Sequence, residues 1–145
     1  MKKKIYLILL LILIISCFFI YYIEHHDKKG FYTIKGDNIK NITKIVGKRE
    51  LIKKDYEYKN SVITKTYKYK NVKDPYTDLS LYIDYLKSNS NFMITKNYDL
   101  NNKKDDIELS RNSNKKGYIV IIKIKYNSNS YTIKIIRGKG KIKLS

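Results

Sequence analysis

The chain has 145 residues, which is enough for one ordinary domain once an N-terminal segment is set aside. Its formal net charge is +18, but the cations comprise 28 Lys and only 3 Arg, and lysine lacks the planar fork that reads bases and phosphates. This composition argues against a dedicated nucleic-acid binder. The single cysteine, Cys17, excludes an internal disulfide and any metal site that needs several thiolates.

The N-terminus carries an apolar run, Ile5 to Ile23, of 19 residues without a charge. As a helix this run would be about 28 Å long, close to the hydrocarbon thickness of a bilayer. Three lysines, residues 2–4, precede it, and positive flanks stay in the cytoplasm. We therefore expect a cytoplasmic flank (1–4), a transmembrane helix (5–23), a juxtamembrane linker (24–36) and an extracytoplasmic domain (37–145).

The residues Ile14-Ile15-Ser16-Cys17 resemble the bacterial lipobox, in which a small residue before the cysteine permits cleavage and lipidation. The alternative to a spanning helix is therefore a lipoprotein signal that ends before Cys17. The apolar run continues through Phe18 to Ile23, however, where lipoproteins usually have a polar tether. Signal-peptide apolar regions also span only about 7 to 15 residues. We favour the uncleaved helix, with Cys17 facing lipid.

The next part of the chain has the pattern of β-strands. Inside the linker lies one short apolar piece, Phe31 to Ile34, and a short element is expected at Ile42 to Val46. Beyond it, β-branched and aromatic residues alternate with lysine. This alternation predicts strands near Glu50 to Tyr56 and from Val62 to Asn71.

One helix is indicated after these strands. Asp74 is a suitable N-cap, Pro75 is tolerated at the first helical position, and Asp78 favours the positive end of the helix dipole. The spacing i, i+3, i+4, i+7 gives an apolar stripe of Leu79, Tyr82, Ile83 and Leu86. A further strand is expected from Phe92 to Leu100.

The C-terminal third predicts a β-hairpin across the loop Asn127 to Ser130, with Tyr126 paired to Tyr131. This register places the alternating isoleucines on one face and sets Lys123 opposite Lys134 on the other. A preceding strand, Asp106 to Ser110, folds back beside the hairpin. We expect it to set Ile107 against Ile122 and Leu109 against Val120, which places Asp106 beside Lys123.

The order of elements predicts an α+β fold, with a transmembrane helix followed by one small domain in which a single helix packs on an antiparallel, meander-like sheet. The patterns "TYKYKNVKDPYTDLSLYIDYLK" and "GYIVIIKIKYNSNSYTIKIIRGKG" resemble small membrane-tethered or secreted clostridial-type proteins of uncharacterised function. The resemblance covers about residues 42 to 140. It implies location and fold, and it carries no activity.

The sequence contains no catalytic motif. The only histidines, His25 and His26, lie at the membrane exit, so a Ser-His or Cys-His nucleophile in the domain is excluded. We expect no cofactor and no metal site.

These observations favour a noncatalytic module of a bacterial cell membrane that binds an envelope protein or an anionic envelope polymer. The candidate contacts are Lys123, Lys125 and Lys134 on the outer side of the terminal hairpin. An envelope-acting enzyme that uses carboxylates and a surface nucleic-acid binder are the alternatives.

The spanning helix and the lipid anchor differ in one testable respect. We expect Cys17→Ala to leave both the apparent mass and the membrane association unchanged, because a spanning helix does not depend on the thiol. Membrane fractionation and mass spectrometry measure this. Incorporation of a fatty-acid probe into the wild type, lost in the variant, would instead identify a lipoprotein.

Overall fold

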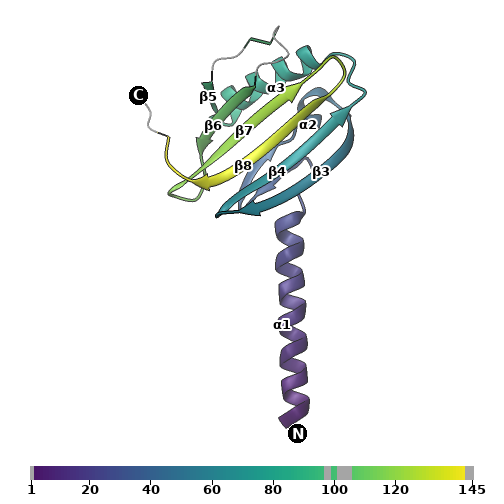
Figure 1. Ribbon diagram of the computed structural model, residues 1–145, viewed down its shortest axis with the longest axis vertical. Helices are drawn as coiled ribbons and strands as arrows, with labels where there is room; N and C mark the ends of the chain where they lie inside the picture. Colours follow the sequence, from purple (N-terminus) through teal and green to yellow (C-terminus); the bar gives the residue numbers. More distant parts are fainter. Residues whose placement is uncertain (1, 97–98, 101–105, 143–145) are drawn as a thin grey trace.

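In the computed structural model, residues 2–96, 99–100 and 106–142 are described. The first helix, α1 (Lys2–His25), extends away from the folded domain as a stalk (Figure 1). Its segment Lys4–Tyr22 has a mean hydropathy of 2.7, and none of this segment is buried against the rest of the protein. The helix is therefore long and apolar enough to cross a membrane.

The rest of the chain forms an α+β domain, as the sequence predicts. The elements that follow α1 are β1 (Phe31–Ile34), β2 (Asp37–Lys40), α2 (Thr43–Val46), β3 (Glu50–Lys59), β4 (Val62–Lys70), α3 (Pro75–Asn89), β5 (Met93–Lys96), β6 (Ile107–Asn112), β7 (Tyr118–Tyr126) and β8 (Tyr131–Lys139). The predicted strand from Phe92 to Leu100 is observed as β5, and residues 97–98 lie outside the described part.

Two antiparallel sheets make up the domain. The first is the β1-β2 hairpin, and the second has six strands in the order β3-β4-β8-β7-β6-β5. Strands β5 to β8 are neighbours in sequence and form a meander, whereas β4 lies beside β8. Helix α3 connects β4 to β5 and crosses one face of the sheet (Figure 1). The β3-β4 hairpin before the helix and the β5 to β8 meander after it therefore share one core.

Helix α3 begins and packs as its sequence indicates. The Asp74 carboxylate accepts hydrogen bonds from the Thr77 backbone N–H at 3.1 Å and from the Thr77 hydroxyl at 2.6 Å. Proline occupies the first helical position. The apolar stripe is at most 2% exposed: Leu79, Tyr82, Ile83 and Leu86. Burial of each such side chain stabilises the domain by about 1.5–3 kcal/mol.

The predicted register of the terminal hairpin is confirmed. Tyr126 pairs with Tyr131, and Lys123 pairs with Lys134. Two isoleucines from each strand point into the core and are 0% exposed: Ile122, Ile124, Ile133 and Ile135. The alternation of apolar residues therefore determined the register correctly.

The predicted register of the neighbouring strand is wrong by two residues. Ile107 pairs with Ile124 rather than with Ile122, because pairing continues as far as Asn112 opposite Ile119, and the loop 113–117 then joins the two strands. That loop is closed by a 2.9 Å hydrogen bond from the Ser113 backbone N–H to the Tyr118 carbonyl. A shift of two residues keeps every side chain on its predicted face but changes its partner across the strands.

The predicted linker, 24–36, overlaps the folded domain. Tyr32 and Ile34 are 2% and 1% exposed and belong to the hydrophobic core. The Tyr32 and Tyr69 hydroxyls lie 3.0 Å apart in a hydrogen bond that links β1 to β4. The folded domain therefore begins with β1, only a few residues beyond α1.

The turn between β3 and β4 contains only Asn60 and Ser61. Their φ values of 51° and 63° are those of a two-residue turn that matches the twist of the flanking strands. This tight turn lies at the end of the sheet where α1 joins the domain (Figure 1).

Candidate functional site at the end of α1 and on the outer sheet face

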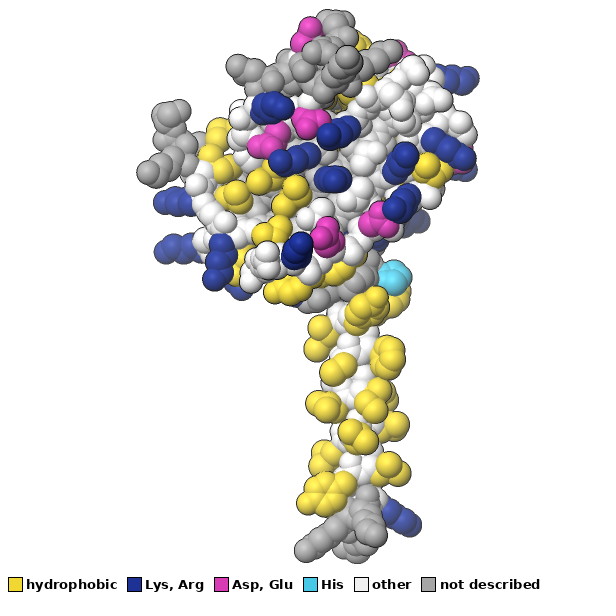
Figure 2. Space-filling model, viewed as in Figure 1, with side chains coloured by type: hydrophobic (Ala, Val, Ile, Leu, Met, Phe, Trp, Pro, Cys, Tyr) yellow, Lys and Arg dark blue, Asp and Glu magenta, His cyan; other side chains and the backbone are white. Residues whose placement is uncertain are grey.

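The six-stranded sheet has a covered face and an open face. The inner face packs against α3 and the β1-β2 hairpin and carries the core residues. The outer face is open to solvent, and Figure 2 shows charged and apolar side chains spread over it. Candidate sites therefore lie on the outer face and where α1 meets the domain.

A cluster around Asp27 joins the end of α1 to the sheet. The Asp27 carboxylate accepts hydrogen bonds from Lys65 Nζ at 3.1 Å, from the Tyr67 hydroxyl at 2.8 Å and from the Thr33 backbone N–H at 3.0 Å. Lys54 Nζ lies 2.7 Å from the same carboxylate. One acidic side chain thus links the end of α1 to β1, β3 and β4.

The environment of Asp27 favours its charged form. Burial by itself raises the pKa of this carboxyl, but hydrogen bonds from Lys54, Thr33 and Tyr67, together with the Lys65 charge, lower the pKa below its usual value. Lys65 is only 1% exposed, and burial lowers its pKa while the Asp27 charge opposes that change. The two charges therefore depend on each other.

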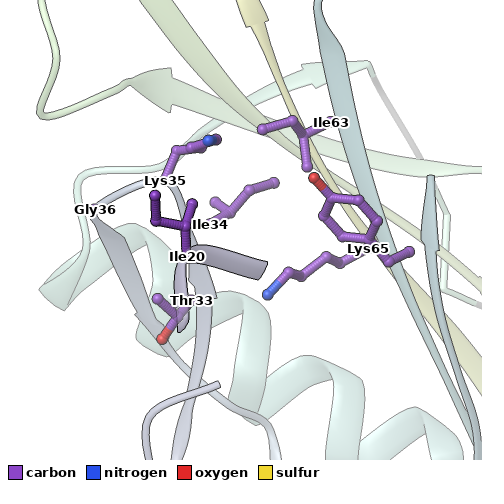
Figure 3. Close-up of a pocket in the computed structure, with 8 residues that line it drawn as sticks. Ile20, Thr33, Ile34, Lys35, Gly36, Ile63 and Lys65 are labelled. Atoms are coloured by element: carbon purple, nitrogen blue, oxygen red, sulfur yellow. The ribbon is translucent and has the colours of Figure 1, made fainter. Parts of the chain in front are cut away.

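A cavity of about 250 Å³ lies beside this cluster. Figure 3 shows side chains from α1, β1 and β4 around the same space. Its lining is Ile20, Thr33, Ile34, Lys35, Gly36, Tyr56, Ile63 and Lys65. Ile20 belongs to the apolar segment Lys4–Tyr22, so the cavity lies where this segment of α1 meets the domain, and its mostly apolar lining can accept an apolar group.

All three arginines of the chain are bound to buried carboxylates. Arg49 donates from Nε and Nη2 to the two oxygens of Asp78, each at 2.6 Å. Asp37 is 0% exposed and accepts hydrogen bonds from Arg111 and Arg137, each at 3.3 Å. Arginine therefore holds the domain together instead of forming an exposed binding site.

Asp78 lies in the first turn of α3, as the sequence indicated, and it has a further role in joining parts of the domain. Its carboxylate also accepts a 3.3 Å hydrogen bond from the Tyr131 hydroxyl, so it links α3 to β8 and to the segment before β3. Asp78 is 5% exposed, and an unpaired carboxylate would be unfavourable there. Its position in the first turn of α3 was readable from the sequence, but its buried partners were not.

The predicted contact residues on the outer face are partly neutralised. Lys123 lies 3.0 Å from Glu108, and Lys125 lies 3.1 Å from Asp106. The predicted contact of Asp106 with Lys123 is wrong because of the two-residue register shift. Lys134 is exposed and makes no ion pair within the described part of the chain.

Among the described residues, Lys68 is a second exposed lysine without an ion pair on this face, and the sequence analysis did not name it as a contact residue. Pairing of β4 with β8 sets Lys68 opposite Thr132 and Lys134 opposite Thr66. Lys68 is exposed and, like Lys134, has no ion pair among the described residues. The pairing joins strands far apart in sequence, so no local pattern could have revealed it.

The other half of the outer face is apolar. Ile121 pairs with Ile136, and Ile119 lies two residues before Ile121 on the same side of β7. These side chains are half-buried, and Val62 beside them is 36% exposed. The open face thus presents lysines at one end and aliphatic side chains at the other, near the turn between β3 and β4.

The remaining candidate residues lie on α1 or just after it. Cys17 is exposed on the apolar segment of α1, and its lipidation stays a prediction. The His26 ring stacks on Tyr22 with 3.8 Å between centroids. Among the described residues, no group of three or more His, Cys, Asp or Glu side chains is placed to hold a metal ion.

Comparisons with known proteins found no match. No protein-family model matches the chain, and neither a curated protein nor a solved structure is significantly similar to it. The function is therefore inferred from the site geometry.

The Asp27 cluster predicts a specific loss of stability. We expect Asp27→Asn to destabilise the domain by about 3 kcal/mol, because it leaves the buried Lys65 ammonium without its counter-charge. Asp55→Asn is the matched control, since Asp55 pairs with Lys53 on the surface and should contribute less than about 1 kcal/mol. Thermal unfolding of the full chain in nanodiscs, followed by tyrosine circular dichroism, measures both.

The same cluster predicts a pH dependence. The folded-state pKa of Asp27 lies below its unfolded value, so its stabilisation is present above about pH 4 and is lost as the pH falls through the folded pKa. Asp27→Asn should flatten this acid limb of the stability curve. If the variant loses stability at acid pH as steeply as the wild type, other carboxylates cause the acid sensitivity.

Proposed function

We propose that the protein is a single-pass protein of a bacterial cell membrane that presents a noncatalytic binding domain outside the cytoplasm. Two features support the anchoring: the apolar segment Lys4–Tyr22 is long enough to span a bilayer, and lysines at positions 2–4 precede it. The domain follows α1 after a few residues, so it stays close to the membrane.

The binding surface in this proposal is the outer face of the six-stranded sheet. The observation that carries it is the pair Lys68 and Lys134, which are exposed near the centre of an uncovered face and have no ion pair among the described residues. Neighbouring lysines, by contrast, lie beside Glu108 and Asp106. An anionic envelope polymer would gain affinity by releasing counterions as it meets the free lysines.

The state of the buried carboxylates favours binding over carboxylate catalysis. A general acid needs a raised pKa, whereas the pKa of Asp27 is lowered. Asp37 and Asp78 are each bonded to arginine and buried. These three groups are occupied in holding the fold, and an envelope-acting enzyme would need other residues.

The topology is tested by reporter fusions after Lys73 and after Ser145. Both positions follow α1, so a reporter active only outside the cytoplasm should be active at each. Activity of a cytoplasm-only reporter at either fusion would reject the proposed orientation.

Two matched double variants test the binding surface. Lys68→Ser with Lys134→Ser should weaken binding to poly(glycerol phosphate) and lower the slope of log K against log salt by about 1–2. Lys123→Ser with Lys125→Ser removes the same charge but leaves Glu108 and Asp106 unpaired. Sedimentation with proteoliposomes that contain the full chain measures both.

We expect the thermal midpoints of both variants to stay close to the wild type, because the core side chains lie on the opposite face. The proposed polymer contact is rejected if the Lys68 and Lys134 variant binds as tightly as the wild type at low salt. In that case an envelope protein becomes the candidate partner.

A further inference from the structure

Three chain segments meet at the end of the sheet where α1 joins the domain. They are the turn 58–62, the loop 113–117 and the chain end 139–142, and we call them the membrane-facing end. The Asn114 side chain donates to the Gly36 carbonyl at 3.4 Å, and the Gly140 N–H donates to the Gly117 carbonyl at 3.0 Å. Because Gly36 shares a cavity with Ile20 of α1, this end lies beside the helix exit.

The membrane-facing end carries positive charge only. Its exposed lysines are Lys59, Lys115, Lys116, Lys139 and Lys141, and none of the three segments contains an acidic residue. The opposite end of the sheet mixes both signs, as in the 3.5 Å pair of Lys70 with Glu50. The net positive charge of the sheet is therefore greater at the end beside α1 than at the opposite end.

Apolar side chains accompany these lysines. Tyr58 is 63% exposed at the tip of the β3-β4 hairpin, and Val62 on its other side is 36% exposed. Lys115 Nζ lies 5.3 Å from the ring centroid of Tyr118. Tyrosine beside lysine is the combination that favours a membrane-water interface, where rings sit at headgroup level and ammonium groups meet phosphates.

We propose that the membrane-facing end docks on anionic phospholipid headgroups of the bilayer that α1 crosses. The connection through α1 makes this contact intramolecular, so even a weak attraction holds the domain against the surface. Lysines within about one Debye length of a negative bilayer, about 8–10 Å, each add to the attraction. A soluble polyanion is not held near this end by α1, so lipid headgroups are the favoured ligand of the membrane-facing end.

Docking would fix the direction in which the domain presents its outer face. Val62 begins β4 at the membrane-facing end, and Lys68 lies six residues farther along the same strand. The pair Lys68 and Lys134 would therefore lie farther from the bilayer, where an envelope polymer can reach them. This inference rests on the proposed membrane anchoring but not on the identity of the polymer or protein that is bound.

The test compares the full chain in nanodiscs of phosphatidylcholine with the full chain in nanodiscs that also contain phosphatidylglycerol. Amide hydrogen exchange is measured at Asn60, Ser61 and residues 113–117. We expect about tenfold slower exchange at these amides with phosphatidylglycerol, and loss of that protection at high salt. Exchange in the core strands serves as the internal reference.

A matched pair of triple variants identifies the surface. Lys59→Ser, Lys115→Ser and Lys116→Ser together should abolish the protection by phosphatidylglycerol. The control replaces Lys68, Lys73 and Lys134 by Ser, which removes the same charge from other surfaces and should leave the protection in place. The salt dependence of the wild type supplies a readout that needs no variant.

The outcomes separate the two proposals. A chain that does not co-elute with nanodiscs would overturn both the anchoring and the docking. A chain that co-elutes but exchanges equally in both lipid compositions would overturn the docking alone. Equal loss of protection in the two triple variants would also overturn it, because total charge rather than this end would then be responsible.

Discussion

Ion pairs at the edges of the core connect the parts of the domain, because each buried charge there needs an opposite charge beside it. Lys65 meets Asp27, Arg49 meets Asp78, and Arg137 shares Asp37 with a second arginine. Each acid lies on a segment outside the six-stranded sheet, and each cation lies in the sheet or next to it. Removal of one member would leave a buried or partly buried charge without its counter-charge, which is unfavourable. The ion pairs thus fasten the α1 exit, β2 and α3 to the sheet.

The same chain shows how arginine and lysine divide their roles. Each of the three arginines contacts a buried carboxylate, where the guanidinium fork can donate several hydrogen bonds at once. The lysines are mostly on the surface, and Lys65 is the exception among the described buried residues. The number of lysines therefore overstates the cationic surface of the outer face, where acidic residues neutralise several of them.

The contacts at the end of α1 hold the short segment that follows this helix against the domain. Only a short segment separates α1 from β1, and Asp27 within that segment is held by side chains of β3 and β4. The end of the sheet beside α1 bears lysines and exposed Tyr58, while the outer face extends away from it (Figure 1, Figure 2). If α1 crosses a bilayer as proposed, the Asp27 contacts would hold the outer face at a fixed distance from that bilayer.

Local periodicity determined the α+β class, the apolar span, the cap of α3 at Asp74 and the hairpin register at Tyr126 and Tyr131. Each depends on residues close in sequence, so spacing alone carries the information. The four residues of β1 were too few for such a pattern to distinguish a strand from a linker. Tertiary structure decided the pairing of β4 with β8, the loop length that sets Glu108 beside Lys123, and the burial of Lys65 against Asp27. These contacts join residues far apart in the chain, and only three-dimensional packing selects among the partners that local sequence leaves equivalent.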